Sequence, residues 1–163
     1  MLWKMPLLFN SSLGIKFSPE QVAAEMLNFM RADEKRRYKI TIGTDSERAG
    51  DSRADFVTAI VIHRVGNGGR YFWRHLELEK IHTLRDRILN EVLISLNVAK
   101  QFLEVIKLYS LPAFDFEIHI DIGENGETRS MIQEVVAMVR ANNFAAKTKP
   151  ESYAASNVAD RHV

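Results

Sequence analysis

Two acidic residues stand at the ends of apolar stretches of the sequence, where a carboxylate needs a chemical partner. Asp45 lies at the end of the alternating stretch at residues 39–46, and Asp121 at the end of the one at residues 114–122. Burying a carboxylate alone costs several kcal/mol, so such an acid caps a turn, pairs with a base or holds a metal ion. One explanation of Asp45 followed by Ser46 is structural, because this pair of residue types often begins a turn. Convergent carboxylate oxygens, however, are hard ligands that suit Mg²⁺ or Mn²⁺.

A third acid, Glu91, lies within a long helix expected over residues 83–109. Apolar residues recur there at helical spacing, and Glu91 falls on or beside their inward stripe. That position is unfavourable unless the carboxylate meets a cation or a hydrogen-bond donor. Asp86, near the start of the same helix, has a structural explanation as a partner of the helix dipole. We therefore take Glu91, and not Asp86, as a candidate site residue.

A fourth acid, Asp160, belongs to a pattern in the last part of the sequence. Ser152 is expected to cap a short final helix, in which Ser152, Ser156 and Asp160 recur at four-residue spacing. Residues four apart lie on one face of a helix. The final helix can therefore bring Asp160 to the other acids.

The spacing of the apolar residues predicts the elements that position these acids. Ser18 and Gln21 form a capping box that opens a leading amphipathic helix, and a glycine-rich turn at residues 66–69 joins two strands into a hairpin. The expected helices cover about residues 19–32, 83–109 and 127–140, with the short final one after residue 152. The expected strands cover residues 39–46, 55–65, 71–79, 114–122 and 144–149, with a loop at residues 47–54.

The order of these elements predicts an α/β fold with one mixed sheet. The first three strands form an antiparallel meander, and the long helix is the right-handed crossover that lets the fourth strand lie parallel to the first. The five-stranded sheet then has the order 3-2-1-4-5, with helices on both faces. Asp45 and Asp121 lie together at the carboxyl ends of neighbouring strands, where open sheets hold ligands. We expect Glu91 and Asp160 to complete a cluster of four carboxylates there.

Composition is that of a soluble globular protein with no general affinity for polyanions. The 163 residues suffice for one domain, expected at residues 18–163 after an irregular arm at residues 1–17. The absence of cysteine excludes disulfides and thiolate metal sites and fits a reducing compartment. The apolar opening at residues 1–9 is too short for a secretory or membrane-spanning segment, so we interpret the protein as cytoplasmic and expect no membrane partner. With a net charge of +1, a nucleic-acid site has to be a local patch.

Four short motifs, in order along the chain, resemble those of one known family. They are Ile42-Gly43-Thr44-Asp45-Ser46, His119-Ile120-Asp121-Ile122-Gly123, Lys147-Thr148-Lys149-Pro150 and Ala155-Ser156-Asn157-Val158-Ala159-Asp160-Arg161. With the order Asp, Glu, Asp, Asp of the acids, they resemble the ribonuclease H-like superfamily and, within it, the bacterial ribonuclease H-like YkuK family. The resemblance covers nearly the whole chain from residue 17 onward. It implies a ribonuclease H-like fold.

The resemblance also implies a nuclease, a hydrolase that cleaves phosphodiester bonds of RNA or DNA with two ions of Mg²⁺ or Mn²⁺. Asp45 would bridge the two ions, Asp121 and Glu91 would complete one ligand shell, and Asp160 would hold the other ion. The candidate substrate contacts are Ser46, His119, Lys147, Lys149 and Arg161, and the basic ones would clamp phosphates. The sequence has a single helix between the fourth and fifth strands and so lacks the extended basic region with which ribonuclease H enzymes hold their substrate. The resemblance therefore does not imply a preference for RNA:DNA hybrids.

Other chemistries stay open on the sequence alone. His119 and Asp121 share a strand face and could ligate zinc or manganese with His162 or His63, or His119 could hydrogen-bond a neighbour or orient Asp121. Ser46 as a nucleophile has no identifiable base. An actin-type ATPase needs two such domains, and a haloacid dehalogenase-type phosphatase needs later motifs that do not occur here. The alternative from another class is a ribonuclease H-like module that binds nucleic acid or a protein without cutting.

Overall fold

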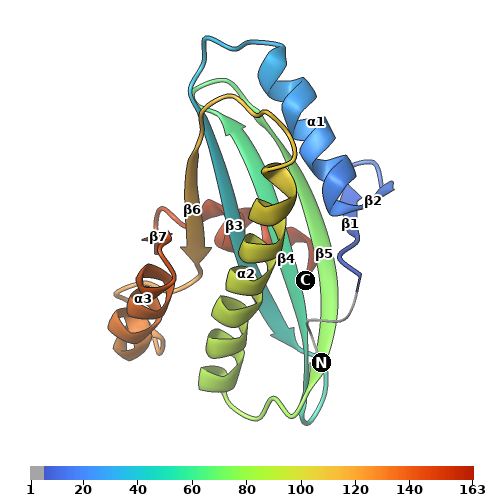
Figure 1. Cartoon of the computed structure of the whole chain (residues 1–163). Coiled ribbons are helices and arrows are strands. Elements are labelled where there is room, and N and C mark those ends of the chain that lie inside the picture. Colours follow the sequence, from blue (N-terminus) through green and yellow to red (C-terminus); the bar gives the residue numbers. More distant parts are fainter. Residues whose placement is uncertain (1–5) are drawn as a thin grey trace.

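The computed structural model describes residues 6–163, which fold around one seven-stranded mixed sheet (Figure 1). The strands are β1 (Phe9–Ser11), β2 (Lys16–Phe17), β3 (Tyr38–Arg48), β4 (Arg53–Arg64), β5 (Gly69–Glu79), β6 (Asp115–Ile120) and β7 (Ala145–Lys147). Their order across the sheet is β2-β1-β5-β4-β3-β6-β7. The predicted α/β class is confirmed, and the five predicted strands lie in the predicted order as β5-β4-β3-β6-β7.

The helices occupy the connections that the sequence predicts. They are α1 (Pro19–Arg31), α2 (Leu84–Ile106) and α3 (Ile132–Ala141), the last preceded by a 3₁₀ turn at Arg129–Met131. The C-terminal helical segment, residues 154–162, joins a π-helical turn (Ala154–Val158) to a 3₁₀ turn (Ala159–His162). α1 begins with the predicted capping box of Ser18 and Gln21, and α2 begins with a second one of Thr83 and Asp86. Asp86 therefore stabilises the start of its helix, as we interpreted it.

Strand pairing places the end of β6 beside the C-terminal part of β3. β3, β4 and β5 form the antiparallel meander, while β6 lies parallel to β3 on its other side. The last parallel pair joins Thr44 to Ile120. Asp45 and Asp121 each follow this pair by one residue. The crossover through α2 is thus what places the two acids next to each other.

The two faces of the sheet are covered differently. α1 and α2 lie on one face and enclose the main core with α3, while the C-terminal helical segment lies on the opposite face (Figure 1). A smaller core on that opposite face contains Val57, Ala59, Val61, Ala154 and Ala159. A Cβ atom at Gly43 would lie 2.4 Å from the backbone nitrogen of Ala155. Because Gly43 has no side chain, the C-terminal helical segment can lie directly on β3.

The structure corrects several element boundaries. Residues 9–11 form β1, which pairs with β5, and residues 16–17 form β2, which pairs with β1. The sequence predicts an irregular arm there, and residues 1–5 of that arm lie outside the described residues. The predicted loop at residues 47–54 is shorter, because the hairpin of β3 and β4 keeps pairing beyond the end of β6. The final helix is π-helical and 3₁₀ instead of α-helical. Within residues 6–163, no helix is long and apolar enough to cross a membrane.

Candidate carboxylate site

Asp45, on β3, and Asp121, directly after β6, lie close enough for their charges to interact. Asp45 is only 9% exposed. Burial and, next in size, the charge of Asp121 raise the pKa of Asp45 from 3.8 to about 7, although a hydrogen bond from the backbone of Ser46 opposes the shift. The two carboxylates therefore repel each other where the topology predicts that they meet.

Glu91 reaches the same edge from α2. It is 4% exposed, and its Oε1 accepts a short hydrogen bond from the hydroxyl of Ser46. Its other oxygen, Oε2, is buried and has no hydrogen-bond partner among the described residues. A buried polar atom without a partner is unfavourable, so it requires an explanation such as a bound water, a bound ion or a catalytic role.

The surroundings of Glu91 disfavour its charged form. Burial raises the pKa of Glu91 from 4.5 to about 8, and the charges of Asp45 and Asp121 act in the same direction. The hydroxyl of Ser46 and the guanidinium of Arg87 oppose this rise without cancelling it. A bound divalent cation would reverse the balance, because a nearby positive charge favours an ionised carboxylate.

One oxygen of Asp121 already has two partners. Oδ1 accepts a hydrogen bond from the hydroxyl of Ser156 at 2.6 Å and lies 3.2 Å from Nζ of Lys149. Ser156 belongs to the C-terminal helical segment, and Lys149 to the loop after β7. Asp121 is thus oriented from two directions by segments that follow it in the sequence.

Asp160 completes the group from the 3₁₀ turn of the C-terminal helical segment. It is exposed, and it lies close enough to Asp45 for its charge to contribute to the raised pKa of Asp45. The predicted serine pattern is also present, since the hydroxyls of Ser152 and Ser156 lie 2.8 Å apart. We refer to the four acids Asp45, Glu91, Asp121 and Asp160 as the carboxylate edge.

Arg87 is a residue of this region that our reading of the sequence did not single out. Its Nη1 donates to the backbone carbonyl of Ser46 at 3.1 Å, and its charge favours the ionised form of Glu91. Arg87 precedes Glu91 by one turn of α2, the spacing at which side chains on a helix meet. That spacing is the signal that could have identified it.

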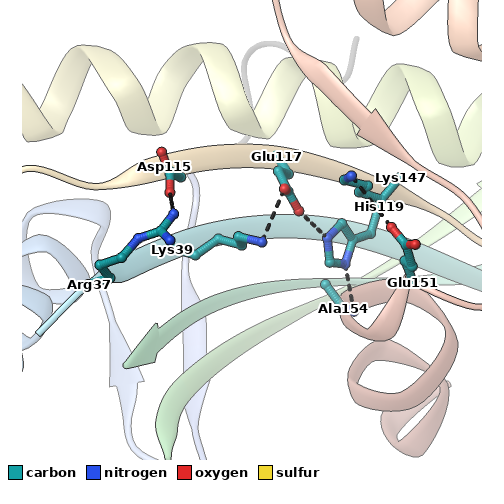
Figure 2. A network of polar contacts seen from close by, with 8 residues as sticks. All are labelled: Arg37, Lys39, Asp115, Glu117, His119, Lys147, Glu151 and Ala154. Carbon is teal, nitrogen blue, oxygen red and sulfur yellow. Dashed lines mark hydrogen bonds and ion pairs between the residues drawn. The ribbon is translucent and has the colours of Figure 1, made fainter. Parts of the chain in front are cut away.

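His119 belongs to a buried network on the face of β6 (Figure 2). It is 1% exposed, and its Nδ1 accepts a hydrogen bond from the backbone N–H of Ala154 at 3.1 Å. The ring proton is therefore on Nε2, which donates to Glu117 at 3.0 Å. Nζ of Lys39 lies 3.2 Å from the other oxygen of Glu117. With both ring nitrogens engaged, His119 is in no position here to ligate a metal ion or to contact a substrate.

The other histidines considered for a zinc or manganese site lie elsewhere. The ring of His162 stacks on Trp73 at a centroid distance of 4.2 Å, and the ring of His63 lies edge-on to Tyr153 at 6.0 Å. Across residues 6–163, no three His, Asp or Glu side chains stand ready-made as a metal-binding group. The carboxylate edge is thus a gathering of acids whose side chains are not yet arranged as a complete ligand set.

The three basic residues predicted to contact a substrate differ in their surroundings. Lys149 contacts the carboxylate edge through Asp121. Lys147 instead pairs with Glu151 at 3.4 Å. Arg161 is exposed beside Asp160 in the sequence. Of these three residues, Lys149 is therefore the one that contacts an acid of the carboxylate edge.

Comparison with known proteins gives this geometry a context. A model of the family described as ribonuclease H-like matches residues 21–163 of the sequence. The chain belongs to the ribonuclease H-like family. The matched region contains all four acids of the carboxylate edge, and the resemblance that we inferred from the motifs is confirmed. Membership of the ribonuclease H-like family connects the chain with nucleic acid at the level of general function.

A similar protein in the ribonuclease H-like YkuK group supports the same assignment. The uncharacterized protein YkuK of Bacillus subtilis (strain 168) is 31% identical over 165 residues, which cover 94% of this chain and 95% of that protein. No solved structure matches the chain.

The donor chemistry of the carboxylate edge fits a divalent cation. Its four side chains offer only oxygen ligands, which suit Mg²⁺ and Mn²⁺. The unpartnered Oε2 of Glu91 is the atom whose burial a cation would best compensate. Within the ribonuclease H-like family, this edge is therefore the place to look for metal-dependent chemistry.

Proposed function

We propose that the chain is a metal-dependent nuclease that hydrolyses phosphodiester bonds of RNA or DNA, with two ions of Mg²⁺ or Mn²⁺ at the carboxylate edge. The observation that carries the proposal is the buried Glu91 carboxylate, whose Oε2 has no partner among the described residues and which lies beside two further acids. A fold gains nothing in stability from this arrangement, because the charges repel and burial penalises them. The arrangement becomes favourable once positive charge is bound.

The protein residues have distinct tasks in such a site. Bound ions would lower the pKa of the attacking water and stabilise the leaving 3′ oxygen. Asp45, which interacts with both Asp121 and Asp160, is central among the acids and suits a bridging position. Ser46 holds one oxygen of Glu91 through its hydroxyl and leaves the other available. The contact with Ser46 orients the carboxylate of Glu91, while the remaining acids would have to converge on the ions.

Residues around the carboxylate edge would bind the substrate through its phosphates. Lys149 contacts Asp121, Arg161 follows Asp160 in the sequence, and Lys147 lies two residues before Lys149. Because the net charge of the chain is only +1, binding would depend on this local group and would weaken steeply with added salt.

A second candidate is a ribonuclease H-like module that binds nucleic acid without cutting it. It is favoured by one observation, since the described residues contain no ready-made group of three metal-binding side chains. This alternative expects nucleic-acid binding that needs no divalent ion. It also expects that Glu91→Gln leaves the function unchanged.

A cleavage assay separates the two candidates. We would incubate the full chain with end-labelled single-stranded RNA, single-stranded DNA, duplex and hybrid substrates in Mg²⁺, in Mn²⁺ and in chelator. We expect cleavage only with a divalent ion, and a loss of about a hundredfold or more in Asp45→Asn, because that variant removes the central ligand. Asp115→Asn is the matched control, since Asp115 is an exposed acid of β6 that pairs with Arg37.

The possible results lead to different conclusions. Retention of cleavage by Asp45→Asn would refute the assigned site. Metal-independent binding without any cleavage, unchanged in Glu91→Gln, would favour the binding module. Equal loss of activity in Asp115→Asn would point to a general effect of removing negative charge.

A further inference from the structure

Lys149 occupies a defined position beside the carboxylate edge. Its Nζ lies 3.2 Å from Oδ1 of Asp121, the same oxygen that accepts the hydrogen bond from Ser156. The side chain of Lys149 is 52% exposed, whereas that of Asp121 is 21% exposed. The ammonium group is thus in contact with a partly buried acid on one side and with solvent on the other.

The backbone fixes where Lys149 begins. Its N–H donates to the carbonyl of Ile122 at 2.7 Å, which ties the loop after β7 to the extension of β6. A Cβ atom at Gly123 would lie 3.0 Å from Cβ of Lys149. The stem of Lys149 therefore packs closely on the chain directly after Asp121, which places its ammonium within reach of that acid.

An ammonium group at this place competes with a divalent ion for the same acid. It supplies positive charge to Asp121, and it repels a further cation that approaches. A backbone phosphate of nucleic acid is an alternative partner for the same group, because lysine binds phosphates as a mobile point charge. Transfer of Lys149 from Asp121 to a phosphate would therefore release a ligand oxygen.

We propose that Lys149 is a resident cation of the carboxylate edge, which holds Asp121 and weakens divalent-ion binding until a phosphate of the nucleic acid draws its ammonium away. This inference rests on the proposed function and adds that the binding of metal ions and the binding of substrate are coupled. Metal ions and substrate would each increase the affinity for the other, as thermodynamic linkage requires. Lys149 is a positioning residue in this scheme.

Calorimetric titration of Mn²⁺ into the full chain tests the inference without measuring activity. We expect Lys149→Met to bind Mn²⁺ about tenfold more tightly than the wild type, because a neighbouring positive charge is removed. Lys147→Met removes the same charge two residues away, where the ammonium faces Glu151, and should stay within about twofold of the wild type. Lys149→Arg keeps the charge and should behave like the wild type.

A second titration measures how an oligonucleotide changes the affinity for Mn²⁺. In the presence of a nuclease-resistant phosphorothioate oligonucleotide, the wild type should bind Mn²⁺ several-fold more tightly, and Lys149→Met should gain much less. An uncharged methylphosphonate oligonucleotide of the same sequence should produce no gain in either protein. Circular dichroism melting would show that each variant is folded.

The results also separate this inference from the proposed function. If the wild type binds Mn²⁺ and Lys149→Met binds it no more tightly, the role of Lys149 is refuted while the metal site stands. If Lys147→Met tightens binding as much as Lys149→Met, the effect is one of general charge and the inference also fails. If neither the wild type nor Lys149→Met binds Mn²⁺, both proposals fail.

Discussion

The face of β6 carries two groups of acids that the protein treats in opposite ways. In its first half, each acid has a cation from β3 or from the residue directly before it, with Asp115 lying 3.1 Å from Arg37 and Glu117 lying 3.2 Å from Lys39 (Figure 2). At its end, Asp121 also contacts a cation, Lys149, but it lies among the other acids of the carboxylate edge. Burial acts to raise the pKa of Glu117, yet hydrogen bonds from His119 and Lys39 outweigh it and lower the pKa.

The difference teaches which acids serve the fold. The pKa of Glu117 is lowered, so ionisation of this acid stabilises the folded state. The pKa values of Asp45 and Glu91 are instead raised, to about 7 and about 8. Acids that stabilise a fold are matched with cations, whereas acids that are concentrated against their own repulsion are candidates for binding positive charge, as we propose for the carboxylate edge. The two groups differ in their partners and not in residue type.

The largest effect should come from breaking the matched group. Glu117→Ala leaves the buried ring of His119 without its acceptor and Lys39 without its acid. We expect the free energy of unfolding to fall by about 2 to 3 kcal/mol, because a buried donor is stripped of its partner. Urea denaturation at pH 7 measures this loss. An unchanged denaturation midpoint would show that the Glu117 network is not a structural element.

Ionisation of the acids at the carboxylate edge should lower the free energy of unfolding, whereas ionisation of Glu117 raises it. The folded state holds protons on Asp45 and Glu91 at pH values where the unfolded state has released them, because both pKa values are raised. The stability that these groups contribute is therefore complete below about pH 4 and is lost as the pH rises to about 8. We expect the free energy of unfolding in chelator to be lower at pH 8 than at pH 5.

Asp45→Asn is the variant that sharpens this comparison. It removes one of the two raised carboxyl groups and its repulsion with Asp121. At pH 8 without metal ions we expect it to be more stable than the wild type by about 1 to 2 kcal/mol and to show a flatter dependence on pH. Thermal melts at several pH values in chelator provide the measurement. A variant less stable than the wild type at pH 8 would mean that the carboxylate edge is not under electrostatic strain.

The smallest effect should come from the exposed pair at the start of β6. The side chains of Arg37 and Asp115 are 79% and 57% exposed, so solvent screens their attraction. Arg37→Ala should change the free energy of unfolding by about 0.5 kcal/mol or less. Denaturation under the conditions used for Glu117→Ala makes the two results comparable. A change as large as that of Glu117→Ala would erase the distinction between buried and exposed pairs.

The sequence predicts the central part of the fold because its signals there are long and regular. Alternating residues mark β3, β5 and β6, and a run rich in Val and Ile marks β4. The length of α2 forces a crossover that puts β6 beside β3. The adjacency of Asp45 and Asp121 follows from that order alone. The strands β1 and β2 are three and two residues long, too short for any periodicity to appear, and they form because β5 offers an open edge.

The contacts that the sequence does not reveal depend on register and on distant segments. Glu117 pairs with Lys39 only because the parallel ladder of β3 and β6 aligns them within reach. Lys149 meets Asp121 because the loop after β7 is tied to the extension of β6. His119 is likewise oriented toward Glu117 because the C-terminal helical segment packs on β3 and donates the N–H of Ala154 to its ring. No local pattern of residue types encodes these pairings.

Calorimetric titration of Mn²⁺ at pH 8 into the wild type and Glu91→Gln tests the central claim most directly. Glutamine preserves the size of the side chain and an oxygen that can accept from Ser46, but it removes the charge beside Asp45 and Asp121. We predict that the wild type binds Mn²⁺, that Glu91→Gln loses about tenfold or more in affinity, and that Asp115→Asn matches the wild type. Equal binding by the wild type and Glu91→Gln, or no binding by the wild type, would contradict a metal site at the carboxylate edge.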